Sequence, residues 1–167
     1  DAVINVGETV NVDLSEYQST SYEVDPTLSR YYSLMDEAQS FLQYQLRSEQ
    51  GQEALSILRD RGYNDEILEE FGVGVALSSI SLTKFLLAKS YSEHDLVDVN
   101  LSRYVDDELK DVFFDRLMFP IHNKFGKVIA YSGRAIPKNS TIKYINTSNT
   151  PIYLKGDVVY NSPRAKN

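Results

Sequence analysis

The chain has 167 residues, of which 42% are hydrophobic, so it can bury one sizeable core and favours one domain over two. It has no cysteine, which excludes disulfide frameworks, thiolate zinc sites and cysteine nucleophiles. It also has no run of about eighteen apolar residues, which excludes a membrane-spanning helix. Both observations suit a soluble cytoplasmic protein. The net charge of −7 is unevenly divided: residues 1–115 carry −15 and residues 116–167 carry +8, so a segment attractive to polyanions lies in an acidic protein.

The first segment, residues 1–24, alternates weakly between apolar and polar residues, which predicts an extended lead-in or linker. Asp25 and Pro26 then signal the start of a helix. Apolar residues recur after them at three- and four-residue spacing, so we expect an amphipathic helix over about 26–48.

Two shorter helices are expected next. The first covers about 51–61, and Gly62 is placed to end it in a left-handed conformation. The second covers 65–71, with Asn64 as its N-cap and Gly72 closing it.

The middle of the chain gives weaker signals. Residues 73–76 form a short apolar run that predicts a strand, and Ser81 is expected to cap a further helix. Residues 92–111 show no clear period, so their structure is left open.

In the basic half of the chain the apolar period changes to two. This predicts strands at 116–121 and 128–133, joined by a turn at 123–126, and a further strand at about 142–145. Helices followed by strands favour an α+β fold, with a helical N-terminal part and a small antiparallel or mixed sheet that contains the 116–134 hairpin.

The sequence shows no complete active site. It has no Gly-Lys-Ser/Thr phosphate loop and no Gly-x-Ser-x-Gly elbow. His94 and His122 are its two histidines, neither has a motif neighbour that would orient it, and a surface or edge position explains them better than catalysis. We therefore expect no catalytic residue in this chain.

The densest group of carboxylates is formed by Asp106, Asp107, Glu108, Asp111 and Asp115. Carboxylates three and four residues apart on one helix could hold Mg²⁺. A solvated helix face explains the group more simply, so we expect no metal site here.

Five short blocks follow one another in the basic half, at 116–121, 126–129, 132–134, 143–147 and 155–161. In order and spacing they resemble the blocks of the bacterial DnaG-type DNA primases, enzymes that synthesise short RNA primers on single-stranded DNA. Similar segments upstream extend the resemblance over about 35–160. Each block alone is a weak signal, but five in series are specific.

The resemblance implies that residues 25–161 form the N-terminal subdomain of a primase RNA polymerase core. In such primases the basic residues of these blocks line a groove that holds the template and the initiating nucleotides. Arg suits bidentate binding of phosphate, Lys supplies a point charge, and an aromatic ring can stack on a base. The residues at matching positions are Arg116, Arg134, Lys143 and Lys155, with Arg61 on the same surface, Tyr144 placed to stack and Asn146 placed to hydrogen-bond sugar or base.

Partners and cofactors also follow from the resemblance. The expected partners are a single-stranded DNA template, nucleoside triphosphates and an RNA–DNA hybrid, with the replicative helicase bound through parts outside this sequence. The family's Mg²⁺ or Mn²⁺ carboxylates and its separate zinc-binding domain are also outside it. We therefore expect this chain to bind no cofactor and to be inactive alone.

The end of the sequence bears on its extent. Ser162 and Pro163 have the pattern of a helix start, which predicts that residues 162–167 are the truncated beginning of a helix in a longer primase. The alternative interpretation is a non-catalytic acidic protein-interaction module whose basic face is incidental. Salt dependence of single-stranded DNA binding distinguishes the two.

Overall fold

The computed structural model describes residues 25–136 and 142–155. The chain divides into two compact units, Asp1–Arg30 and Tyr31–Asn167, and the described residues of the first are those where helix α2 (Pro26–Arg47) begins. The predicted lead-in and the predicted helix start at 162–167 lie outside the described residues. Within the described part, no helix is both long and apolar enough to cross a membrane.

Helix α2 begins at the predicted residue. Pro26 is its first residue, and the Asp25 carboxylate accepts a hydrogen bond of 2.8 Å from the backbone N–H of Thr27. The predicted apolar stripe is its buried face, which consists of Tyr31, Leu34, Met35, Ala38, Leu42 and Leu46.

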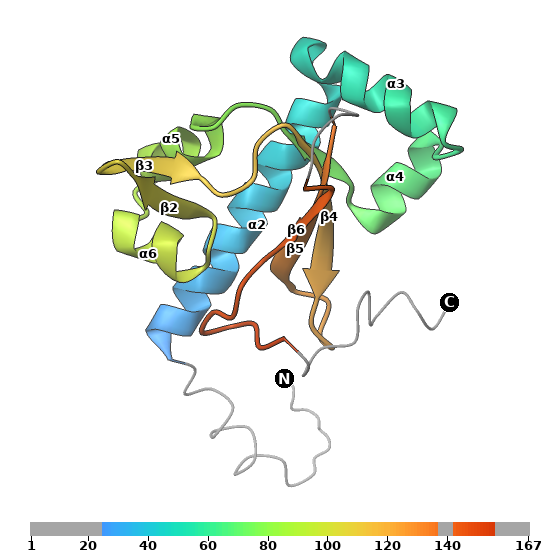
Figure 1. The fold of residues 1–167 in the computed structure, drawn as a ribbon. Coiled ribbons are helices and arrows are strands. Elements are labelled where there is room, and N and C mark those ends of the chain that lie inside the picture. The colour runs from blue at the N-terminus through green and yellow to red at the C-terminus, as the bar shows by residue number, and fades with distance from the viewer. Residues whose placement is uncertain (1–24, 137–141, 156–167) are drawn as a thin grey trace, which may run out of the picture. The chain divides into compact units, whose positions relative to one another are not determined.

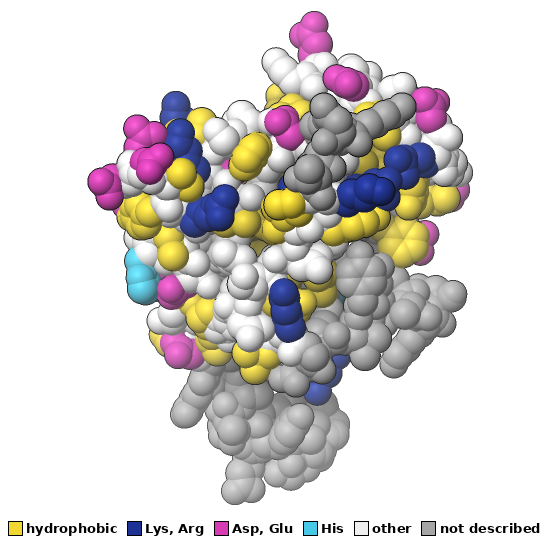
Figure 2. All heavy atoms as spheres, viewed as in Figure 1, with side chains coloured by type: hydrophobic (Ala, Val, Ile, Leu, Met, Phe, Trp, Pro, Cys, Tyr) yellow, Lys and Arg dark blue, Asp and Glu magenta, His cyan; other side chains and the backbone are white. Residues whose placement is uncertain are grey.

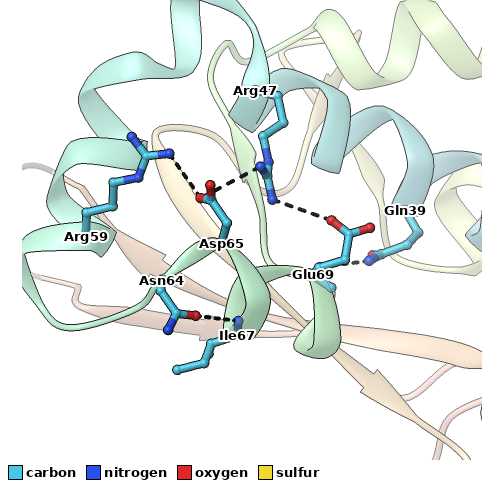
Figure 3. Close-up of polar contacts among 8 residues, drawn as sticks. Gln39, Arg47, Arg59, Asn64, Asp65, Ile67 and Glu69 are labelled. Carbon is cyan, nitrogen blue, oxygen red and sulfur yellow. Dashed lines mark hydrogen bonds and ion pairs between the residues drawn. The ribbon is translucent and has the colours of Figure 1, made fainter.

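The next two predicted helices are also confirmed. A short 3₁₀ turn (Glu49–Gly51) leads into α3 (Gln52–Asp60), and α4 spans Asp65–Phe71. The side chain of Asn64 accepts a hydrogen bond of 2.8 Å from the N–H of Ile67, which is the predicted N-cap (Figure 3). Gly72 ends α4 in the left-handed conformation, with φ of 69°.

Polar contacts fix α4 against its neighbours. Asp65 lies 3.0 Å from Arg59, and Arg47 of α2 lies 3.5 Å from Glu69 (Figure 3). The hydrogen bond and charge of Arg59 lower the pKa of Asp65. The side chain of Gln39 donates a hydrogen bond of 2.7 Å to the carbonyl of Gly72. The exposed ion pairs add little stability, but together with the Gln39 bond they fix how α4 leads into the following strand.

The central sheet is antiparallel and has the strand order β1-β4-β5-β6. Its strands are β1 (Gly74–Ala76), β4 (Arg116–His122), β5 (Val128–Ala135) and β6 (Tyr144–Asn146). The predicted hairpin is therefore confirmed, and the last strand begins two residues later than predicted. Helices first and a small antiparallel sheet after them confirm the α+β class.

The two faces of the sheet are covered differently. Helix α2 packs on one face, where a Cβ on Gly74 would lie 2.8 Å from that of Leu42 and where the buried Tyr131 hydroxyl donates a hydrogen bond of 2.7 Å to Gln39. On the other face, α3 and α4 bury Val75 and Leu117 in a cluster with Leu46, Ala54, Leu55, Leu58, Leu68 and Val73. That cluster covers the β1–β4 side. Val128–Gly133 of β5 are buried as well, whereas Arg134 is half-buried and Tyr144 and Asn146 of β6 are exposed, and these three residues form what we call the open face.

The ambiguous segment 92–111 forms a helix and a hairpin. Helix α6 (Glu93–Asp98) is followed by a second, two-stranded sheet of β2 (Ser102–Val105) and β3 (Glu108–Asp111). With helix α5 (Ser81–Ala88) these elements lie to the left of α2 in Figure 1, whereas the central sheet lies to its right. The prediction of a carboxylate-rich helix was wrong, because Asp106 and Asp107 take positive φ angles and form the hairpin turn.

Helix α5 is capped by a residue from far along the chain. Ser81 is its first helical residue rather than the predicted cap, and Ile80 holds the cap position. The buried Asp111 carboxylate accepts hydrogen bonds from the N–H groups of Leu82, at 3.1 Å, and Thr83, at 2.8 Å. One member of the acidic group is thus an internal helix cap and not a solvated charge.

Candidate nucleic-acid interface

The paired ends of β5 and β6 carry three of the seven site residues that the sequence singled out, namely Arg134, Tyr144 and Asn146. Strand register sets Arg134 of β5 opposite Tyr144 of β6, and Ser132 opposite Asn146. Directly opposed residues in an antiparallel pair point to the same face, and Leu117 and Phe119 of β4 continue these two rows. Tyr144 and Asn146 are exposed, and Arg134 is half-buried.

Arg134 and Tyr144 form a close pair. The guanidinium donates a hydrogen bond of 2.7 Å to the Tyr144 hydroxyl, and its carbon lies 5.5 Å from the centre of the Tyr144 ring. Tyr144 is 52% exposed in spite of this contact. A planar cation and an accessible ring are therefore held together at the edge of the sheet.

An aromatic pocket of about 320 Å³ opens beside this pair. Its wall combines the loop before α4, the end of α4 and the open rows of the sheet. The lining residues are Tyr63, Phe71, Val73, Phe119, Pro120, Ser132 and Tyr144. Four aromatic rings in a wall that also presents polar atoms favour a flat ligand that is partly apolar and partly polar. Sequence reasoning placed several of these residues in matching blocks but gave no signal that they would form one pocket.

Arg116 does not reach this surface. It is 7% exposed, and its guanidinium donates hydrogen bonds of 3.1 to 3.2 Å to the carbonyls of Gly133, Lys143 and Ile142. Burial lowers the pKa of Arg116. This arginine ties β6 and the residues before it to the rest of the sheet.

Gly133 makes this arrangement possible. A Cβ at that position would lie 2.8 Å from the Phe113 ring and 3.1 Å from the side chain of Arg116. Only glycine leaves room for the Arg116 side chain and the Phe113 ring to lie directly against β5 here. The glycine of the 132–134 block thus has a packing role.

The remaining predicted residues lie around the open face without converging on one point. Lys143 is exposed immediately before β6, and its carbonyl also accepts a hydrogen bond of 2.7 Å from Ala135. Arg61 is exposed in the loop that carries Tyr63. Lys155 is exposed, two residues after Tyr153, which packs on the far end of β5. The structure brings together Arg134, Tyr144 and Asn146, and it does not bring Lys155 to them.

The histidines differ from their predicted surroundings. His122 is the last residue of β4, as predicted, but it is only 7% exposed, so the surface alternative of its predicted surface or edge position was wrong. His94 is exposed, as expected, but lies 3.1 Å from Asp98, an orienting neighbour that the sequence analysis missed. The i,i+4 spacing on one helix was the available signal.

Among residues 25–136 and 142–155, no group of three or more Asp, Glu or His side chains could hold a metal ion.

Comparison with known proteins identifies the family. A family model described as the N-terminal domain of the DNA primase catalytic core matches residues 41–166. The chain belongs to this primase family. The resemblance drawn from the five blocks is thus confirmed, and the interaction-module alternative is not favoured.

Relatives of known function agree with this assignment. The DNA primase of Staphylococcus aureus (strain COL) is 31% identical over a match that covers 99% of this chain and 29% of the relative. The DNA primase of Pseudomonas putida is 34% identical over a match that covers 81% of this chain and 21% of the relative. The chain thus spans less than a third of these curated relatives.

Two solved structures share the fold. The RNA polymerase domain of the Mycobacterium tuberculosis primase DnaG superposes with a TM-score of 0.77 at 30% identity, covering 83% of this chain and 46% of that one. A DnaG primase catalytic domain solved with bound single-stranded DNA superposes with a TM-score of 0.78 at 30% identity. The match covers 84% of this chain and 44% of that one. The architecture of this chain is therefore that of a part, less than half, of these primase catalytic domains.

Proposed function

We propose that this chain supplies part of the template-binding surface of a DNA primase, and that the open face of β5 and β6 binds single-stranded DNA. The observation that carries the proposal is the Arg134–Tyr144 pair at the mouth of the aromatic pocket. A base can stack on the ring while the guanidinium meets a phosphate. The similar DnaG catalytic domain that was solved with bound single-stranded DNA supports this choice of ligand.

The charge of the segment supports the same ligand. Between Arg116 and Lys155 the sequence contains no Asp or Glu. In Figure 2 basic and hydrophobic side chains lie beside one another on the viewed side, and acidic ones stand mostly near its upper and left margins. Such a surface attracts a single strand through its phosphates and its ring faces together.

The other parts of the proposal extend from the family. Nucleoside triphosphates and an RNA–DNA hybrid would contact the separate basic residues Arg61, Lys143 and Lys155. Mg²⁺ or Mn²⁺, the zinc-binding domain and the helicase contact belong to the parent primase outside this chain. A primase acts on chromosomal DNA, so we propose a cytoplasmic location.

The first test measures how salt affects binding of an oligothymidylate. Each phosphate contact contributes a slope of about −0.7 in a plot of log affinity against log salt for a single strand. We expect Arg134→Ala and Lys143→Ala each to flatten the slope by about that amount. Tyr144→Ala should weaken binding at every salt concentration and leave the slope unchanged. Fluorescence anisotropy with a labelled oligonucleotide gives both quantities.

Lys84→Ala is the matched control, because Lys84 is an exposed cation on α5, away from the open face. An equal loss of slope in this variant would show that binding depends only on overall charge, and would contradict the proposal.

The second test concerns catalysis. Phosphoryl and nucleotidyl transfer depend on metal-borne charge stabilisation, and the described residues hold no group suited to a metal ion. We expect the isolated chain to make no RNA primer on single-stranded DNA with Mg²⁺ or Mn²⁺, in an assay where a full-length primase is active. Primer synthesis by the chain alone would contradict this assignment of roles.

A further inference from the structure

The turn between β4 and β5, residues 123–127, presents an aromatic ring to solvent. Phe125 is 77% exposed, the most exposed of the large hydrophobic side chains in the described part of the chain. Lys124 and Lys127 flank it in the sequence and are exposed. The ammonium of Lys124 lies 5.4 Å from the centre of the ring. A single exposed ring is common on protein surfaces, so the feature that points to a ligand is the combination of an accessible ring with a cation on each side of it.

The backbone of the turn is fixed by its own hydrogen bonds. The side-chain oxygen of Asn123 accepts bonds of 2.9 and 3.0 Å from the N–H groups of Phe125 and Lys127. The N–H of Asn123 donates to the carbonyl of Lys127 at 2.9 Å, and Gly126 takes a positive φ of 83°. The ring is therefore presented by a rigid turn, which lowers the entropy lost when a ligand stacks on it.

We infer that the β4–β5 turn is a second contact for single-stranded nucleic acid, in which one base stacks on Phe125 and the neighbouring phosphates meet Lys124 and Lys127. An exposed ring between two cations matches the alternation of bases and phosphates in a single strand. This inference rests on the proposed function, since the strand must reach the turn from the Arg134–Tyr144 pair.

The length of β5 sets the length of strand that uses both contacts. Arg134 is six residues beyond Val128, where β5 leaves the turn, so the two contacts are at least about 20 Å apart at about 3.4 Å per residue. Val128–Gly133 between them are buried, so the nucleic acid meets the protein at the two contacts and not along β5 itself. A stacked strand rises about 3.4 Å per nucleotide and needs on the order of six nucleotides to span them. Affinity should thus rise with oligonucleotide length until the turn is reached.

The first experiment introduces a fluorescent reporter. The sequence has no tryptophan, so Phe125→Trp creates a single one in the turn. We expect its fluorescence to be quenched when an oligothymidylate is added, because a base stacks on the indole. Tyr44→Trp is the control, since Tyr44 is 69% exposed on α2, and its fluorescence should not change. An unchanged Phe125→Trp signal at saturating oligonucleotide would overturn the inference.

The second experiment compares lengths from about 4 to about 16 nucleotides, the range of single-strand site sizes. Phe125→Ala should lower the affinity for the longest oligonucleotides by roughly fivefold or more and leave that for the shortest unchanged. Tyr144→Ala should weaken binding at every length. Identical length dependence in wild type and Phe125→Ala would sink the inference while leaving the proposed function intact. Absence of binding to the short oligonucleotides, or no effect of Tyr144→Ala on them, would instead count against the proposed function.

Discussion

Replacing Asp111 with alanine is expected to lower the free energy of unfolding by about 3 kcal/mol, because the change removes a helix cap and leaves buried donors without an acceptor. The carboxylate accepts hydrogen bonds from the backbone N–H groups of Leu82 and Thr83. It also accepts a hydrogen bond of 2.5 Å from the Thr83 hydroxyl. The hydroxyl also lies 2.7 Å from that of Ser102 in β2. Urea unfolding followed by circular dichroism measures the loss.

The pH dependence of this variant has a definite sign. Burial raises the pKa of Asp111 above its ordinary value of 3.8, against the opposing effect of the Thr83 and Leu82 hydrogen bonds. The folded state therefore binds the proton more readily than the unfolded state, so protonation of Asp111 stabilises the fold. This stabilisation is complete below pH 3.8, the ordinary pKa, and is lost as the pH rises through the pKa of the folded state. The difference in unfolding free energy between wild type and Asp111→Ala should widen on acidification from neutral pH.

Glu108→Ala is the control, because Glu108 lies on the same strand with its side chain 71% exposed. We expect it to change stability by less than about 1 kcal/mol and to show no such widening. A stability loss for Asp111→Ala no larger than that of the control would show that the cap contributes nothing, and a narrowing difference in acid would show that the hydrogen bonds outweigh burial.

Local patterns predicted local structure well in this chain. The cap by Asn64, the left-handed Gly72 and the period of two in the hairpin each depend on a few neighbouring residues, and each is present in the structure. The same reasoning failed at Asp111, where the partner helix lies 28 residues earlier in the chain. Charge density alone suggested a solvated helix, but two aspartates tolerate positive φ and form a turn instead.

The candidate site shows the same limit. The family blocks predicted a set of basic site residues, but the roles of individual residues depend on strand register and burial. Tyr144 and Arg134 become neighbours only because β6 pairs with β5. The blocks also predicted the same role for Arg116 and Arg134. Arg116 is buried among carbonyls, whereas Arg134 is in contact with solvent. A positive charge in a block does not reveal whether its partner is a phosphate or the protein's own backbone.

Arg116→Met should separate these two roles for the buried arginine. The variant keeps the apolar length of the side chain but loses the bonds to the carbonyls of Gly133, Lys143 and Ile142. Hydrogen bonds from a charged group to buried acceptors are worth about 1.5–3 kcal/mol each, partly offset by relief of the buried charge, so we expect a net loss of about 2–4 kcal/mol in unfolding free energy.

Amide hydrogen exchange locates the effect. The N–H of Ala135 donates to the carbonyl of Lys143, so its exchange reports the pairing of β5 with the chain before β6. We expect faster exchange there in Arg116→Met, and an intermediate rate in Arg116→Lys, which keeps the charge but cannot bridge three carbonyls. Arg103→Met, an exposed arginine of β2, should leave the exchange of Ala135 unchanged.

DNA binding then distinguishes positioning from direct contact. If Arg116 acts by holding Tyr144 and its strand in place, Arg116→Met should weaken oligothymidylate binding severalfold while the slope of log affinity against log salt stays that of the wild type. A phosphate contact would instead flatten the slope by about 0.7. A flattened salt slope in Arg116→Met, together with unaltered amide exchange at Ala135, would show that the Arg116 guanidinium contacts the nucleic acid. That result would contradict its assigned role within the sheet. The internal role is favoured because three of the five guanidinium N–H groups already donate to carbonyls and the side chain is only 7% exposed.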